Sequence, residues 1–175
     1  MEKTISSRIG YQGPFFLIRE HKIEYPDGTR GERMVLEHPG AVAALPLFSD
    51  DTILLVSQYR KALEETTLEI PAGKIETGES LEDCILRELR EETGYSAGRL
   101  DFLISYFPSS GISSEIIHIF LARDLEESER GDFDEHSLSP VILRRKEVER
   151  LIGQGEIRDS KTIIALREGE HRGLI

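Results

Sequence analysis

The sequence predicts an α+β fold, because strand-like and helix-like segments occupy separate stretches of the chain. Runs of apolar and polar residues between positions 14 and 121 form strand-sized pairs separated by turn signals. One strong helical pattern, Leu81–Thr93, interrupts these strands. Two shorter helical patterns follow near the C-terminus, at Lys146–Ile152 and Ser160–Arg167. A chain of 175 residues is long enough to bury a core of its own.

The strand-like runs are expected to form hairpins with turn residues between them. Three such pairs are predicted: 14–25 with Glu32–Glu37, Ala41–Phe48 with Thr52–Gln58, and Leu100–Phe107 with Glu115–Leu121. The first pair is joined by Pro26-Asp27-Gly28, in which glycine can adopt a positive φ. Residues 124–137 are rich in acids and are predicted to form a mobile loop.

Composition narrows the class of protein. The chain is 38% hydrophobic and 31% charged, as expected for a soluble globular protein. Its net charge of −11 argues against a nucleic-acid partner, because phosphate backbones bind basic surfaces. No apolar run reaches the roughly 18 residues of a membrane helix, and the N-terminus does not read as a secretory signal. A lone Cys84 rules out an internal disulfide, and these features together predict a cytoplasmic protein.

The helix predicted at Leu81–Thr93 carries its own end signals. Ser80 can cap the N-terminus, and Gly94 can end the helix in the left-handed conformation. Its apolar residues share one face and are expected to pack in the core: Leu81, Cys84, Ile85 and Leu89. Cys84 is therefore interpreted as a packing residue.

A second face of this helix is acidic. Glu88 lies three and four residues before Glu91 and Glu92, and like charges at this spacing destabilise an isolated helix by roughly 0.2–0.5 kcal/mol per pair. A hard divalent cation makes such a cluster favourable, and oxygen ligands indicate Mg²⁺, with Mn²⁺ as an alternative. Arg87 can reach Glu91 one turn away and fix that carboxylate without occupying the metal site.

The segment before the helix suits the same site. Pro71 fixes the backbone, and Gly73 is expected to let it turn tightly beside a ligand. The loop between them can present the carbonyl of Ala72 to the metal. A strand, a tight loop and an acidic helix in this order favour a metal centre over a solvated charged face.

These residues resemble the Nudix box, whose pattern is filled by Gly73, Glu79, Arg87-Glu88-Leu89, Glu91-Glu92 and Gly94-Tyr95. The resemblance implies a Nudix fold, a mixed β-sheet sandwiched between helices. It also implies hydrolysis of a nucleoside diphosphate linked to another moiety. By position, the expected metal ligands are Glu88, Glu92, Glu91 and the carbonyl of Ala72. Arg87 is expected to orient the acidic side chains.

Further segments are similar to the ADP-ribose pyrophosphatase branch of that family: 40–48, 54–60, 67–76 and 155–162. The branch is usually homodimeric with an exchanged N-terminal strand region. Residues 1–39 are therefore expected to form a β-strand arm, and residues 40–175 the Nudix domain. Ser110 stands where the branch usually has proline, which makes other nucleoside diphosphate sugars credible substrates.

The branch resemblance also implies contacts to the substrate. Arg60 matches the arginine that binds the diphosphate, and Glu115 an acid near the ribose or the metal. Ile18 and Arg19 are expected to flank the adenine across a dimer interface. Glu135, in the acidic loop, is the expected general base.

The predicted function is metal-dependent hydrolysis of the pyrophosphate of a nucleoside diphosphate sugar, with ADP-ribose giving AMP and ribose 5-phosphate as the main hypothesis. The alternatives are another sugar nucleotide of the GDP-mannose type, a dinucleotide, or a nucleotide-sensing domain without catalysis. Sensing domains typically have a broken box, and this one is intact. A prenyl diphosphate isomerase would need an active-site cysteine, whereas Cys84 lies on the core face.

Overall fold

The computed structural model describes residues 1–129 and 138–175. The chain divides into two compact units. The first unit contains residues 1–40 and 106–116, and the second contains residues 41–105 and 117–175. The acidic helix and its preceding loop belong to the second unit.

The first unit is built on an antiparallel sheet of β1 (Lys3–Gln12), β2 (Leu17–Glu24) and β3 (Arg30–Glu37), in that order. The predicted hairpin is β2–β3, and in its turn Gly28 has a φ of 83°. The Asp27 side chain accepts a hydrogen bond from the Thr29 N–H at 3.0 Å. Strand β1 lies within the arm predicted for residues 1–39 but was not expected as a separate strand, because all its residues are exposed and no buried face imposes alternation.

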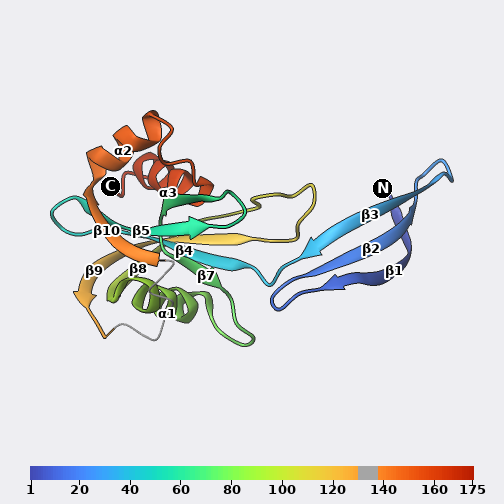
Figure 1. Cartoon of the computed structure of the whole chain (residues 1–175), viewed down its shortest axis with the longest axis horizontal. Helices are drawn as coiled ribbons and strands as arrows, with labels where there is room; N and C mark the ends of the chain where they lie inside the picture. Colours follow the sequence, from blue (N-terminus) through green and yellow to red (C-terminus); the bar gives the residue numbers. More distant parts are fainter. Residues whose placement is uncertain (130–137) are drawn as a thin grey trace. The chain divides into compact units, whose positions relative to one another are not determined.

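The second unit contains two sheets (Figure 1). The four-stranded sheet has the order β7 (Ala72–Lys74), β4 (Ala41–Pro46), β9 (Ile117–Glu127) and β8 (Tyr95–Tyr106). It is mixed, since β4 pairs parallel with β9 and antiparallel with β7. The three-stranded antiparallel sheet has the order β10 (Leu138–Arg144), β5 (Thr52–Arg60) and β6 (Glu65–Glu69).

Three helices cover these sheets: α1 (Leu81–Thr93), α2 (Arg145–Gly153) and α3 (Ser160–His171). Figure 1 shows α1 on one side of the strands and α2 and α3 on the other. This arrangement confirms the prediction of a mixed sheet between helices. The sandwich explains why residues 42–45 of β4 are all fully buried, because this strand has α1 and α3 packed against it.

The predicted ends of α1 are confirmed. The Ser80 hydroxyl accepts a hydrogen bond from the Asp83 N–H at 3.1 Å, and Gly94 has a φ of 76°. The apolar face packs in a cluster with β4, β5 and β9, and Cys84 lies in that cluster with no exposed surface. Cys84 is therefore a core residue, as predicted.

The hairpin predicted from Ala41–Phe48 and Thr52–Gln58 is wrong. These segments enter different sheets as β4 and β5, and only an isolated bridge between Leu47 and Ile53 joins them. Each strand has other partners, β7 and β9 for β4, and β6 and β10 for β5. The third predicted pair is confirmed, because β8 and β9 are neighbours in one sheet.

The acidic segment 124–137 differs in part from the prediction of a loop. Strand β9 runs to Glu127, so residues 124–127 are in a strand. Glu135 lies outside the described residues. No helix within residues 1–129 or 138–175 is long and apolar enough to cross a membrane.

Candidate active site

The start of β7, which follows the short loop after β6, is bonded to the acidic face of α1. The backbone N–H of Ala72 donates to Glu92 Oε2 at 3.0 Å. Two further bonds hold the same loop: the Ala44 N–H donates to the Pro71 carbonyl at 3.0 Å, and the Ile70 N–H donates to Thr162 Oγ1 at 2.8 Å. The Ala72 peptide and the Glu92 carboxylate, predicted to share a site, are thus brought together.

Gly73 is required for a reason that differs from the sequence prediction. Its backbone lies in β7 and does not adopt a left-handed conformation, so a tight turn does not explain the glycine. A Cβ at this position would lie 1.7 Å from Glu88 Cδ and 1.9 Å from Glu88 Oε1. The Glu88 carboxylate therefore fills the space that any other side chain at position 73 would take.

Arg87 holds three carboxylates. Its Nε donates to Glu79 Oε1 at 2.8 Å, and its Nη1 donates to Glu88 Oε1 at 2.8 Å and Glu91 Oε2 at 3.2 Å. The predicted contact with Glu91 is thus present, and the contact with Glu79 is shorter. The hydrogen bonds from Arg87 lower the pKa of Glu79 to about 2. Arg87 therefore orients several box carboxylates at once.

Two acidic groups of the box, Glu88 and Glu92, are difficult to ionise together. Burial raises the pKa of Glu92 to about 7, with a further contribution from the charge of Glu88, although the Ala72 N–H lowers it. Burial also raises the pKa of Glu88, against the effect of Arg87. Both groups would be stabilised as carboxylates by an added positive charge.

The donor set fits a hard divalent cation, since carboxylate and carbonyl oxygens are the ligands that Mg²⁺ and Mn²⁺ prefer. Gly73 leaves the Glu88 carboxylate directly beside the Ala72 loop. Within the described residues, no three His, Cys, Asp or Glu side chains already form a metal-ligand cluster. Arg87 instead bonds to Glu88 and Glu91.

A second charged cluster lies beside this one. Arg60 donates from Nε to Glu69 Oε1 at 2.7 Å and from Nη2 to Glu69 Oε2 at 2.5 Å. Lys161 Nζ donates to Glu69 Oε2 and, at 2.9 Å, to Asp159 Oδ1. Arg60 and Lys161 both lower the pKa of Glu92 through their charges, and the Ile70 N–H, beside Glu69, donates to Thr162, beside Lys161. The two clusters therefore form one electrostatic site.

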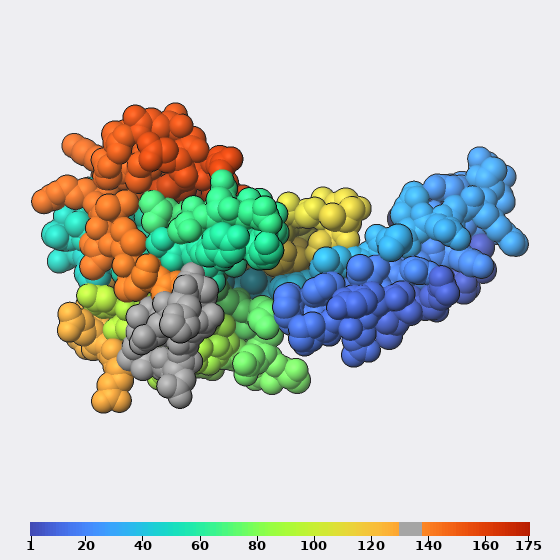
Figure 2. Space-filling view, viewed as in Figure 1, coloured from blue at the N-terminus to red at the C-terminus, as the bar shows by residue number. Residues whose placement is uncertain are grey.

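Sequence reasoning identified Arg60 but missed Glu69 and Lys161. Lys161 is 92 residues from Glu69 along the chain, so no local spacing relates them. A usable signal was the charged segment at residues 158–161, which spans the start of α3 and includes its N-cap Asp159. Figure 2 shows the β5–β6 region next to α3, where Arg158 also bonds to Glu65.

The other predicted substrate contacts lie in the first unit. Arg19 makes a two-pronged ion pair with Glu37, with Nε–Oε1 and Nη2–Oε2 distances of 2.5 and 2.9 Å. Glu115 Oε1 lies 3.6 Å from His38 Nδ1. Ile18 is on β2 next to Arg19. These three residues share a unit, but their roles toward a substrate stay predictions.

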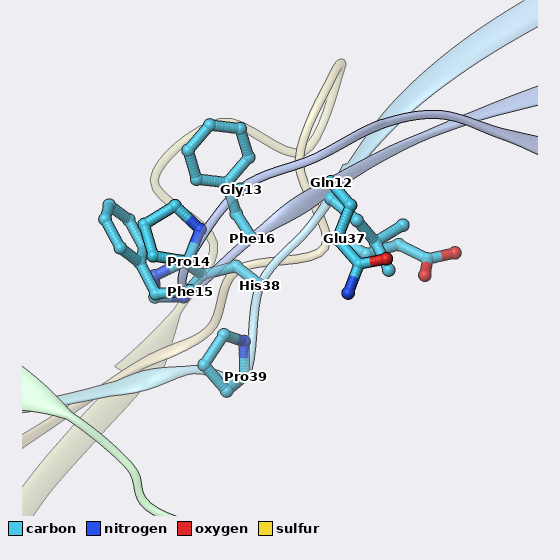
Figure 3. Close-up of a pocket in the computed structure, with 9 residues that line it drawn as sticks. Gln12, Gly13, Pro14, Phe15, Phe16, Glu37, His38 and Pro39 are labelled. Atoms are coloured by element: carbon cyan, nitrogen blue, oxygen red, sulfur yellow. The ribbon is translucent and has the colours of Figure 1, made fainter.

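The first unit also contains an aromatic pocket of about 330 Å³ that the sequence analysis did not identify. Its lining residues are Gln12, Gly13, Pro14, Phe15, Phe16, Leu17, Glu37, His38 and Pro39. The Phe15 ring lies 5.2 Å from Phe16 and 6.3 Å from His38, measured between centroids. Figure 3 shows the rings of Phe15 and Phe16 at one end of the pocket and the Glu37 carboxylate at the other.

Comparison with known proteins assigns the family. The model of the NUDIX domain matches residues 37–165, which include the whole box, and the model of the nucleoside diphosphate sugar hydrolase N-terminal domain matches residues 2–36. The chain belongs to the Nudix family. The predicted Nudix hydrolase is thereby confirmed, and Nudix hydrolases generally use divalent metal ions.

Individual Nudix relatives match over most of their length. The methanol dehydrogenase activator of Bacillus methanolicus is 39% identical, over 95% of this chain and 91% of the relative. The ADP-ribose pyrophosphatase of Bacillus subtilis is 38% identical, with the same coverage. A solved structure described as an ADP compounds hydrolase has a TM-score of 0.86 at 22% identity and covers 99% of this chain and 97% of its own. That likeness confirms the fold.

The variant Gly73→Ala is expected to lose activity while keeping its fold. The new Cβ would displace the Glu88 carboxylate, and we expect the metal-dependent rate to fall by about 10–100-fold or more, as when a ligand loses its orientation. Rate against metal concentration and thermal unfolding measure the two effects. Gly153→Ala is the matched control, because its Cβ meets no atom within 4 Å. A Gly73→Ala variant with the wild-type rate would contradict this role of Glu88.

The variant Glu69→Gln is expected to change the pH dependence of stability. Although burial raises the pKa of Glu69, Arg60 and Lys161 hold it at about 2, below the ordinary 4.5. The ionised carboxylate therefore contributes stability above pH 4.5 that is lost as the pH falls toward 2. Loss of this buried partner should lower the free energy of unfolding at pH 7 by about 3–5 kcal/mol.

Urea unfolding of wild type and Glu69→Gln at pH 7 and near pH 3 measures this effect. The difference between the two proteins should shrink at the lower pH. Glu65→Gln is the control, because its ion pair with Arg158 is exposed and should contribute at most about 1 kcal/mol. A difference that stays constant with pH would mean that Glu69 is not held as a carboxylate by its two cations.

Proposed function

We propose that this Nudix hydrolase cleaves the pyrophosphate of ADP-ribose, giving AMP and ribose 5-phosphate, with Mg²⁺ as its metal. The observation that carries the proposal is the juxtaposition of the Glu92 carboxylate with the Ala72 loop and the cations Arg60 and Lys161. Carboxylates for a metal and cations for a diphosphate are what such a substrate requires. The similarity to ADP-ribose pyrophosphatases supports the choice of substrate.

The metal would be held by Glu88, Glu91, Glu92 and the carbonyl of Ala72. When bound, a divalent cation neutralises charge on the diphosphate and lowers the pKa of a coordinated water. Arg87 keeps its ion pairs with the box carboxylates and limits their rotation. Mn²⁺ has the same ligand preference and is expected to substitute for Mg²⁺.

The protein groups around the metal would position the substrate and move one proton. Arg60 binds the diphosphate through its half-exposed guanidinium, whose orientation Glu69 fixes. Glu135, outside the described residues, is proposed to accept the proton of the attacking water. Glu115 is proposed to act near the ribose.

The aromatic pocket of the first unit is proposed to bind a nucleotide base across a dimer interface, where Ile18 and Arg19 are expected to flank the adenine. Phe15, Phe16 and His38 offer ring surfaces for stacking, and Glu37 offers a hydrogen-bond acceptor at the other end. Ile18 and Arg19, the residues chosen from the sequence, follow directly on Leu17 of the pocket wall. The ion pair of Arg19 with Glu37 would then orient the acceptor.

We also propose that the chain forms a homodimer through its N-terminal arm. The arm exposes several large apolar side chains on β1 and β3: Ile5, Ile9, Tyr11 and Met34. In these three fully described strands, Ile23 alone is buried, so the arm lacks a core of its own. Such a sheet gains stability by packing against a second copy.

Light scattering after size exclusion is expected to give a mass of twice 19.8 kDa. The variant Ile9→Lys should shift this mass toward the monomer, because it places a charge in the buried interface. Lys3→Arg, at the start of the same strand, is the control. A wild-type protein that runs as a monomer at micromolar concentration would contradict the dimer.

Hydrolysis of ADP-ribose, GDP-mannose, UDP-glucose, NADH and diadenosine polyphosphates, with Mg²⁺ and with EDTA, tests the substrate. We expect AMP from ADP-ribose at the highest kcat/KM and none with EDTA. Glu92→Gln should lose at least about 99% of the rate, because a metal ligand loses its charge. Glu82→Gln, on the exposed face of the same helix, should keep it.

The other outcomes separate the alternatives. A higher kcat/KM for GDP-mannose or a dinucleotide would keep the metal site and overturn the choice of ADP-ribose. Binding of nucleotides without hydrolysis of any compound would favour a sensing domain.

A further inference from the structure

Lys161, in the first turn of α3, is a cation taken almost fully out of water. Its side chain is 9% exposed, and its ammonium group donates to Glu69 and Asp159. Burial of an ammonium group is unfavourable unless it is paired, and even a paired buried ion is a weak source of stability compared with an apolar side chain. The position of Lys161 therefore suggests a role in orientation.

The partner of Lys161 is itself fixed from several sides. Glu69 Oε1 accepts from Arg60 Nε at 2.7 Å and from Thr67 Oγ1 at 2.5 Å. Glu69 Oε2 accepts from Arg60 Nη2 at 2.5 Å and from Lys161. The carboxylate cannot rotate without losing bonds on both oxygens. Its plane, and with it the plane of the Arg60 guanidinium, is therefore determined.

The three contacting side chains differ in burial, since Lys161 and Glu69 are buried and Arg60 is half exposed. Lys161 and Glu69 have side chains that are 9% and 5% exposed, whereas that of Arg60 is 42% exposed. The pairing with Glu69 uses Nε and Nη2 of Arg60 and leaves Nη1 outside the pair. A buried ion pair thus presents one half-exposed arginine to solvent.

We infer that Lys161 is a positioning residue, which acts through Glu69 to hold Arg60 in the orientation that binds the diphosphate. The inference rests on the proposed function, in which Arg60 contacts the substrate. Without Lys161, the Glu69 carboxylate keeps Arg60 and Thr67 as its only side-chain partners among the described residues, and it can tilt toward solvent. The guanidinium of Arg60 would then lose its fixed plane, although its charge is unchanged.

The competing explanation is that Lys161 only attaches α3 to β6. A purely structural attachment would lower the stability of the protein but leave KM unchanged. Positioning predicts the opposite pattern, a raised KM with little change in kcat. It also predicts that the effect of Lys161 disappears once Arg60 is gone, because nothing remains to be oriented.

The first experiment is a double-mutant cycle of Lys161→Met and Arg60→Ala with ADP-ribose as substrate. Lys161→Met should raise KM about 10-fold, with kcat within about 3-fold, the lower end of what orienting partners contribute. In the Arg60→Ala background it should change kcat/KM less than about 2-fold. Lys161→Arg, which keeps the charge, should restore most of the loss.

Controls separate positioning from damage to the fold. Lys146→Met, at an exposed site on α2, should keep the wild-type KM. If Lys161→Met does not fold, Lys161→Gln retains a neutral donor to Glu69 and enters the same cycle. Additive effects of the substitutions at positions 60 and 161 on kcat/KM would overturn the inference. An unchanged KM in both Lys161→Met and Lys161→Gln would also overturn it.

The second experiment does not depend on the reaction. The ¹⁵N-resolved NMR signal of the Arg60 Nε–H, assigned by its absence in Arg60→Ala, should be sharp in the wild type. It should broaden or exchange with water at least about 10-fold faster in Lys161→Met, while Lys146→Met keeps it. An unchanged signal would overturn the positioning role. A changed signal in a protein that hydrolyses none of the nucleotides would support the positioning of Arg60 and refute the proposed function alone.

Discussion

The passage of the Glu88 side chain over Gly73 sets the geometry of the candidate active site. Strand β7 and helix α1 can approach this closely only because position 73 has no side chain. The approach places the Ala72 N–H within hydrogen-bonding distance of Glu92. Arg87 holds the carboxylates of Glu88 and Glu91. Both the raised pKa of Glu92 and the suitability of the site for a divalent cation follow from this burial.

A protein with a net charge of −11 must still attract an anionic substrate. The structure meets this requirement locally. Arg60 and Lys161 lie near Glu92, and Glu69 and Asp159 hold them there. The attraction to the paired acids offsets the repulsion between the two cations, while Arg60 stays half exposed. Fixed opposite charges of this kind need little rearrangement when a ligand binds.

The two units differ in how they are packed. The second unit is held by a core in which β4 is buried on both faces. The charged groups lie on α1, α3 and the strands β5 and β6, which surround this core. The first unit has exposed strands and an aromatic pocket, features of a surface that binds other molecules. The two matched domain models divide the chain in a similar way, at residues 2–36 and 37–165.

The sequence by itself determined the features that depend on near neighbours along the chain. Helix α1, its Ser80 and Gly94 ends, the Pro26-Asp27-Gly28 turn and the burial of Cys84 all follow from local capping and periodicity. The box also identified Glu88, Glu91, Glu92 and Arg87 as neighbours, because they share one helix face.

Only the tertiary structure decided which distant segments meet. It placed β4 and β5 in different sheets. Which strands pair depends on how the backbone N–H and C=O groups of all the strands find hydrogen-bond partners. It paired Glu69 with Lys161 across 92 residues, and it showed that Gly73 is needed for the space of Glu88. Contacts between residues far apart in sequence have no spacing pattern, so they could not be derived from the sequence alone.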